Sequence, residues 1–121
     1  MPEILIVEDN LLNLMIEADL LKHFGYEPKK AKNGFEALEI LNKTKIDLVL
    51  LDMELPKMHG LDLLQRIRLN PETRSIKVVA VTGYSDTESE EKFLKAGCHA
   101  VLAKPINFGD FGSQVENFLQ A

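Results

Sequence analysis

The chain has 121 residues, the usual size of one domain, and a formal net charge of −5. This acidic balance argues against a nucleic-acid-binding surface, which normally carries a basic patch. Hydrophobic residues make up 45% of the chain and charged residues 27%, as in an ordinary globular protein that buries its own core.

The N-terminus and the single cysteine indicate the cellular compartment of the protein. The start "MPEILIVED" has no basic residues and too short an apolar run for a signal peptide. No segment approaches the roughly 20 apolar residues of a membrane helix. Cys98 has no second cysteine to pair with, and we interpret it as a small packing residue. We therefore expect a soluble, cytoplasmic protein without a membrane partner.

Strand-like and helix-like segments alternate along the whole chain. Three of the strand-like runs, "ILIV", "LVLL" and "VVAV", are continuously apolar, as strands covered on both faces are. Pro28 would remove a ladder hydrogen bond, so the second run is expected at an edge of the sheet. In chain order the predicted elements are strand Ile4–Val7, helix Leu11–Phe24, strand Glu27–Ala31, helix Gly34–Asn42, strand Leu48–Leu51, helix Leu61–Arg68, strand Lys77–Val81, helix Ser89–Gly97, strand Ala100–Ala103 and helix Phe108–Leu119.

Local residues predict where several helices begin and end. Gly25 is a natural left-handed cap for the first helix, and Pro71 ends the third. Ser85 and Glu88 have the spacing of a capping box before the fourth helix, which closes at Gly97.

Apolar residues at helical spacing predict which faces of two helices meet the core. The second helix has such a stripe at Phe35, Leu38 and Leu41 with Ala37. The last helix also has a stripe, although Gly109 and Gly112 weaken its first turns.

Alternating strands and helices with short connections imply a doubly wound parallel sheet with helices on both faces. In such folds ligands bind beyond the carboxyl ends of the strands. Five polar side chains follow four of the predicted strands at that end: Glu8, Asp9, Asp52, Thr82 and Lys104. A turn or cap could explain each alone, but together they predict a site.

The chemistry of these side chains points to magnesium and phosphate. Three carboxylates on one edge repel each other, and Mg²⁺ removes that cost. Asp52 is central, so it is the candidate nucleophile that forms an aspartyl-phosphate, while Glu8 and Asp9 hold the metal. Lys104 and the Thr82 hydroxyl can then bind phosphoryl oxygens.

The sequence resembles a response-regulator receiver domain (CheY-like) over its whole length. The resemblance rests on "ILIVEDN", "NGFEALE", "DLVLLDMELPKMHG", "VVAVTG" and "GCHAVLAKPI", in this order. It implies the flavodoxin-like (βα)5 fold, an α/β fold whose five parallel strands have the order 2-1-3-4-5. The "GC…A…KPI" ending is also similar to stand-alone cell-cycle receivers of the DivK type.

The resemblance assigns a role to each residue of the predicted site. Asp52 would accept phosphate from a histidine of a kinase or phosphotransferase domain, and Thr82 and Lys104 would sense it. Mg²⁺ would be held by Glu8, Asp9 and Asp52 with the backbone carbonyl of Glu54. The Lys104–Pro105 bond would be cis. The chain would be a signalling module, not an enzyme, and a partner would dock on helix four, strand five and helix five.

Some positions depart from the family pattern. Val101 stands where the signalling aromatic is usual, so Tyr84 or the backbone near Thr82 is the alternative route to the output face. A Tyr84 that merely packs over the loop is the other interpretation. His59 precedes Gly60, and we interpret it as an exposed loop residue. Glu54 and Tyr84 occupy positions that influence the lifetime of the phosphoryl group in the family.

Other functions remain open at this point. We expect residues 1–121 to be a single receiver domain with no output domain, and the alternative is a receiver cut from a hybrid histidine kinase. A metal-dependent phosphohydrolase would need a base, and only His59 offers one. A flavin carrier shares the fold, but Glu8 and Asp9 would repel a phosphate that has no metal.

Overall fold

The computed structural model describes residues 1–84 and 86–121. Within them the chain forms one parallel sheet with the order β2-β1-β3-β4-β5, and helices alternate with the strands. The elements are β1 (Ile4–Val7), α1 (Leu11–His23), β2 (Lys29–Ala31), α2 (Gly34–Lys43), β3 (Leu48–Asp52), α3 (Gly60–Leu69), β4 (Lys77–Thr82), α4 (Thr87–Lys95), β5 (Ala100–Ala103) and α5 (Phe108–Gln120). The predicted fold and strand order are confirmed.

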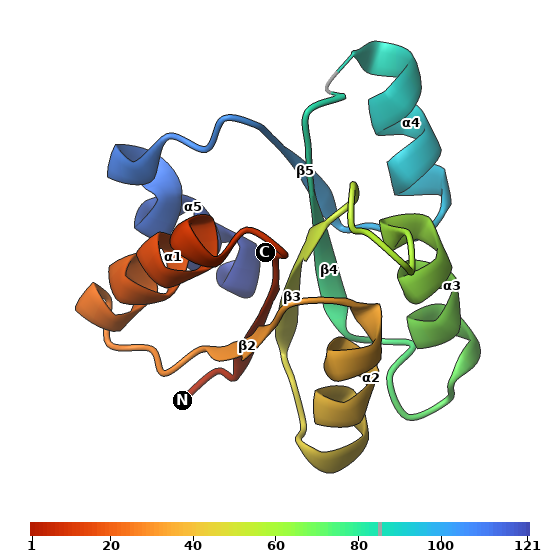
Figure 1. The fold of residues 1–121 in the computed structure, drawn as a ribbon, viewed down its shortest axis with the longest axis horizontal. Helices are drawn as coiled ribbons and strands as arrows, with labels where there is room; N and C mark the ends of the chain where they lie inside the picture. Colours follow the sequence, from red (N-terminus) through yellow and green to blue (C-terminus); the bar gives the residue numbers. More distant parts are fainter. Residues whose placement is uncertain (85) are drawn as a thin grey trace.

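The helices form two layers around the sheet. Helices α1 and α5 cover one face, and α2, α3 and α4 cover the other (Figure 1). A separate apolar cluster fills the space on each side of the sheet. All residues of β1 and β3 are buried, which explains their continuous apolar sequence. Strand β2 lies at the edge, as Pro28 predicted, and begins only after that proline.

The predicted ends of α1 and α3 agree with the structure. Helix α1 is followed by Gly25 at a φ of +91°, and α3 ends before Pro71. Ser85, the predicted cap of α4, lies outside the described residues. The described N-cap is Asp86, whose side chain accepts a hydrogen bond from the Ser89 N–H, and α4 starts earlier than predicted.

The predicted stripe of α2 was wrong for Phe35, whose side chain is 57% exposed. Gly34 and Ala37 are three residues apart, lie on one face of the helix and are buried. Gly34 packs so closely that a Cβ added to it would lie 2.7 Å from Sδ of Met58. Phe35 is one residue further and therefore points about 100° away, toward solvent.

Gly112 of α5 allows the close contact between α5 and the end of α1. A Cβ at this position would lie 2.1 Å from the ring of Phe24. Helix α5 still begins at Phe108, because the Asn107 side chain accepts a hydrogen bond from the Gly109 N–H and caps the weak first turn.

Arg68 joins three segments at the end of the sheet opposite the predicted site. Its Nε and Nη2 donate to the Gly97 carbonyl at 3.1 and 2.7 Å. Its Nη1 donates to the carbonyls of Arg74 and Ile76 at 3.1 and 2.8 Å. Burial lowers the pKa of this guanidinium. The side chain therefore ties the end of α3 to the starts of β4 and β5.

Replacing Arg68 with methionine should lower the free energy of unfolding by about 2–3 kcal/mol, because three carbonyls lose a charged donor. Urea unfolding of Arg68→Met beside Arg66→Met measures this. Arg66 is exposed on the same helix and serves as the control. Equal stability of the two variants would show that the hydrogen bonds contribute nothing.

Candidate functional site

The predicted carboxylates meet at the carboxyl ends of β1 and β3. These strands are neighbours, with Val7 paired to Leu51, so Glu8 and Asp52 follow at the same level. Glu8, Asp9 and Asp52 each present an oxygen, and these oxygens all lie within 4.8 Å of one another. Glu8 and Asp52 are buried and Asp9 is exposed, so the cluster opens to solvent on one side.

Lys104 reaches the same cluster from the end of β5. Its Nζ lies 2.8 Å from Oδ1 of Asp52, and the Lys104–Pro105 bond is cis, as predicted. Burial opposes the charge on Lys104, but the hydrogen bond and charge of Asp52 outweigh it and raise the pKa of the lysine. The lysine is therefore held as a cation against Asp52.

Thr82 ends β4 and is fully buried, and the hydrogen bond that its hydroxyl donates goes to Glu54. It donates to Oε2 of Glu54 at 2.8 Å. Glu54 in turn lies 3.7 Å from Lys104 Nζ through Oε1, and its backbone N–H donates to Oδ1 of Asp52 at 2.9 Å. From the sequence, the backbone carbonyl of Glu54 is expected to bind the metal, and its position to influence the lifetime of the phosphoryl group. The contact between its side chain and Thr82 was not predicted.

The electrostatics of the cluster fit a hard divalent cation. The pKa of Glu8 is raised to about 8, mainly because the carboxyl is buried; the Asn10 N–H lowers it and the adjacent Asp52 raises it, both by less than burial does. Two buried carboxylates and an exposed one thus crowd together, and all their donor atoms are oxygens. Mg²⁺ prefers a few carboxylate oxygens with water completing its shell, so the residues present suit this ion.

A further buried acid lies near the site and was missed from the sequence. Glu17 of α1 has an exposed fraction of only 3% and lines a cavity of about 450 Å³. Glu8, Lys104 and Phe108 line the same cavity. The pKa of Glu17 is raised to about 7, mainly by burial and to a smaller degree by the charge of Asp52, while the charge of Lys104 lowers it. An acid on the mostly apolar helix "LLNLMIEADLLKH" was the only signal in the sequence.

The raised pKa of Glu17 predicts a pH-dependent stability. The unfolded chain loses this proton near the ordinary value of 4.5, whereas the folded chain keeps it up to about 7. The folded state is therefore penalised as the pH rises through this window, and the penalty is complete above it. Glu17→Gln should remove the penalty and stabilise the protein by on the order of 2 kcal/mol near pH 8.

Chelator-treated wild-type and Glu17→Gln protein can be unfolded in urea at about pH 5 and about pH 8 to measure this difference. The stabilisation should be small at the lower pH and large at the higher one. Asp19→Asn, on the exposed side of the same helix, is the control. A Glu17→Gln effect that does not change with pH would contradict the prediction.

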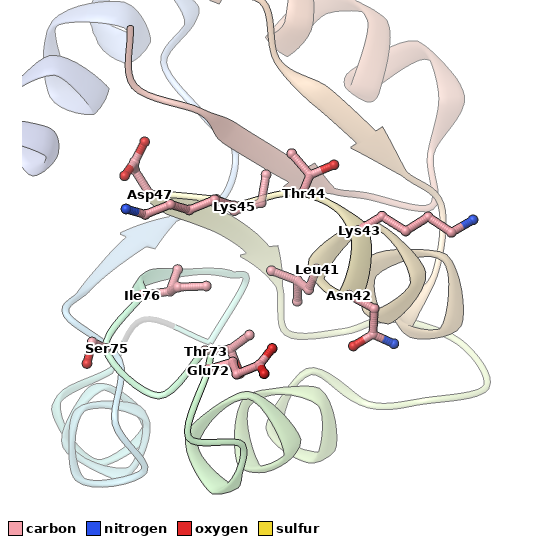
Figure 2. A pocket seen from close by; sticks show the side chains of 11 residues that line it. Leu41, Asn42, Lys43, Thr44, Lys45, Asp47, Glu72, Thr73, Ser75 and Ile76 are labelled. Carbon is pink, nitrogen blue, oxygen red and sulfur yellow. The ribbon is translucent and has the colours of Figure 1, made fainter.

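Another pocket, of about 410 Å³, lies at the opposite end of the sheet. It is lined by the segment from Leu41 to Asp47 and by residues before β4. Figure 2 shows that the Lys43 and Lys45 side chains point in opposite directions, so they do not converge on one ligand. This pocket shares no residue with the carboxylate cluster.

The residues that depart from the family pattern differ in how far they are exposed. His59 is exposed and precedes α3 without making a side-chain capping hydrogen bond, as expected for a loop residue. Tyr84 is 63% exposed, which does not favour packing over the loop. Val101 is half-buried and packs on the α2, α3 and α4 side of the sheet.

A doubly wound parallel sheet with carboxylates, a lysine and a threonine converging at one edge defines a phosphoacceptor class of signalling domain. The family profile of the response regulator receiver domain matches residues 4–116. The chain belongs to this family, the receiver domains of two-component signalling.

Several relatives are similar over nearly the whole chain. The polar-differentiation response regulator DivK of Brucella anthropi is 37% identical over 116 residues, which are 96% of this chain and 94% of the relative. The DivK protein of Brucella ovis is 35% identical with the same coverage. The two proteins are of about the same length as this chain, and the similarity includes the predicted DivK type.

Solved structures also match the fold. A CheY-like receiver domain protein from Methanospirillum hungatei JF-1 has a TM-score of 0.87 and 32% identity, covering 99% of this chain and 94% of that one. The receiver domain of sensor histidine kinase PA1611 from Pseudomonas aeruginosa PAO1 has a TM-score of 0.87 and 27% identity, covering 99% and 98%. That structure holds a magnesium ion in its active-site cleft.

Family membership establishes the general properties of the domain. Receiver domains bind Mg²⁺ in an acidic pocket, interact with histidine kinases and phosphotransferases, and are signalling proteins more than classical enzymes. None of the helices in residues 1–84 and 86–121 is both long and apolar enough to span a bilayer.

Proposed function

We propose that Asp52 is the phosphoacceptor of this receiver domain. The observation that carries the proposal is the position of its carboxylate between the acidic cluster and Lys104. One of its oxygens belongs to the cluster with Glu8 and Asp9, while Oδ1 accepts hydrogen bonds from Lys104 Nζ and the Glu54 N–H. A carboxylate fixed at the centre of a cationic and metal-binding site is oriented for attack on phosphorus.

Glu8, Asp9 and Asp52 would hold Mg²⁺, with the backbone carbonyl of Glu54 as a further ligand. When bound, the cation would neutralise the charges of the carboxylates and of the incoming phosphoryl oxygens. Asp52 then attacks phosphorus, a P–O bond forms, and the P–N bond of the donor phosphohistidine breaks. Lys104 compensates the charge of the transferred phosphoryl group, and Thr82 donates to one of its oxygens.

A histidine kinase or histidine phosphotransferase supplies the phosphoryl group. We infer that residues 1–121 act as one receiver domain whose output is a changed docking surface on α4, β5 and α5. Support comes from Thr82, which ends β4 directly before the loop that leads into α4. Tyr84, exposed in that loop, is the candidate side chain that carries the change, because Val101 supplies no aromatic ring.

The protein should take up one phosphoryl group from acetyl phosphate when Mg²⁺ is present and none when the metal is chelated. Intact-mass measurement detects the adduct, and hydroxylamine should release it as an acyl phosphate does. Incubation with a generic phosphate ester separates the alternative function. Catalytic turnover of that ester without a protein adduct would favour a phosphohydrolase and contradict the proposal.

A further inference from the structure

Glu54 carries a side-chain arrangement that the phosphoacceptor function does not require. This residue lies in the loop after β3, and its side chain is 32% exposed. Its carboxylate nevertheless does not point freely into solvent. Oε2 accepts from the Thr82 hydroxyl at 2.8 Å, and Oε1 accepts from the Gly83 N–H at 2.8 Å. Oε1 also lies 3.7 Å from Nζ of Lys104.

These three donors form an anion-binding set. A hydroxyl, a backbone N–H and an ammonium group converge from the ends of two strands, β4 and β5. Such a set is what a phosphoryl group on Asp52 needs for its oxygens, and Thr82 and Lys104 are the residues proposed for that purpose. In the unphosphorylated protein the hydroxyl and the N–H already donate to Glu54. The ammonium group donates to Asp52 and forms a longer ion pair with Glu54.

The contact also fixes the loop between β4 and α4. The Thr82 hydroxyl donates to Glu54 and at the same time accepts from the Tyr84 N–H at 2.9 Å. Glu54 therefore holds Thr82 and Gly83 directly and Tyr84 through Thr82. In the unphosphorylated protein, hydrogen bonds thus hold the segment from Thr82 to Tyr84 against the loop after β3.

We propose that the Glu54 carboxylate occupies the place of the phosphoryl group at its donors in the unphosphorylated protein. This carboxylate must leave Thr82, Gly83 and Lys104 when Asp52 is phosphorylated. The inference rests on the proposed function, because it takes Asp52 as the acceptor. The Thr82 hydroxyl has one proton and the Gly83 N–H has one, so each serves one anion at a time. The negative charges of Glu54 and of a phosphoryl group that binds the same donors also repel each other.

The displacement has a definite consequence for signalling. The hydrogen bonds from Thr82 and Gly83 to Glu54 stabilise the unphosphorylated state, and they are lost when the phosphoryl group takes the same donors. Glu54 therefore sets a threshold against phosphorylation. In the phosphorylated state, the Glu54 side chain has left its donors and the Thr82 hydroxyl donates to the phosphoryl group. Both changes alter the surface beside Tyr84.

The test measures the affinity for beryllofluoride, a phosphoryl analogue, with Mg²⁺ in wild-type protein and in two variants. Glu54→Ala removes the carboxylate. Glu54→Asp keeps the charge, but its shorter side chain does not reach Thr82 and Gly83 together. Both variants should bind the analogue at least about fivefold more tightly, because bonds to a charged group no longer compete. Glu88 is exposed in the first turn of α4, and Glu88→Gln serves as the control. It removes one negative charge without changing the contacts of Thr82, Gly83 and Lys104.

A second measurement needs no phosphoryl chemistry. In metal-free protein, the Gly83 amide proton should shift upfield in Glu54→Ala and Glu54→Asp, because its carboxylate acceptor is lost. An unchanged Gly83 resonance would show that Glu54 does not accept a hydrogen bond from the Gly83 N–H.

The affinity measurement has its own contradicting outcome. A Glu54→Asp variant with wild-type affinity for beryllofluoride would show that only the charge at position 54 affects binding, and would overturn the proposal that Glu54 competes for the donors. If wild-type protein and all variants fail to bind beryllofluoride, the proposed function fails, and Gly83 still reports on the contact.

Discussion

Asp52→Asn should abolish uptake of a phosphoryl group from acetyl phosphate, at least about a hundredfold below wild type. Asparagine has nearly the same shape as aspartate, so it keeps the packing at the end of β3. It lacks the negatively charged oxygen that attacks phosphorus and the charge that helps to hold Mg²⁺. Intact-mass spectra taken over a time course with Mg²⁺ measure the difference.

The matched control for this experiment is Asp62→Asn. Asp62 is exposed in the first turn of α3 and belongs to no part of the carboxylate cluster. This variant should be labelled at the wild-type rate. If Asp52→Asn were labelled as fast as Asp62→Asn, the phosphoryl group would have to reside on another residue, and the assignment of Asp52 would be wrong.

The affinity for Mg²⁺ should fall steeply as the pH is lowered from about 8 to about 6. Burial raises the pKa of Glu8 to about 8, and the ion binds only after Glu8 has lost its proton. Below that pKa, each pH unit should therefore weaken binding by up to about tenfold. Isothermal titration of wild-type protein with MgCl₂ at several pH values measures the slope.

Two variants separate the contribution of Glu8 to the pH dependence of Mg²⁺ binding from that of Glu17. Glu8→Gln should bind Mg²⁺ weakly and with a much shallower pH dependence. Glu17→Gln, which removes the other acid with a raised pKa near the site, should keep most of the wild-type slope. A wild-type affinity that is constant between about pH 6 and about pH 8 would contradict the role of Glu8 as a buried ligand.

The parallel sheet and the meeting of the predicted site residues at one edge could be predicted because they depend on local patterns, whereas the full strand order followed from the family resemblance. Continuous apolar runs identify buried strands, and parallel strands bring whatever follows them to one edge of the sheet. Glu8 and Asp52 are thus adjacent because β1 and β3 are neighbours. Pro28 placed β2 at the edge for an equally local reason, the loss of a backbone donor.

The features that could not be predicted depend on where side chains point across loops and helices. Glu54 is one polar loop residue among several, and only the folded loop shows that its carboxylate reaches Thr82 and Gly83. Glu17 belongs to a helix with apolar residues on most sides, so its spacing does not show which face is buried. Phe35 was misplaced because the small residues Gly34 and Ala37, not the large ring, form the contact with the core.

The most direct test of the central proposal is to locate the phosphoryl group chemically. Sodium borohydride reduces an acyl phosphate to an alcohol, so a phosphorylated aspartate becomes homoserine. Protein labelled with acetyl phosphate and Mg²⁺ should yield, after reduction and digestion, a peptide with homoserine at position 52. Homoserine at another aspartate, or a stable phosphoryl group on His59, would contradict the proposal that Asp52 is the phosphoacceptor.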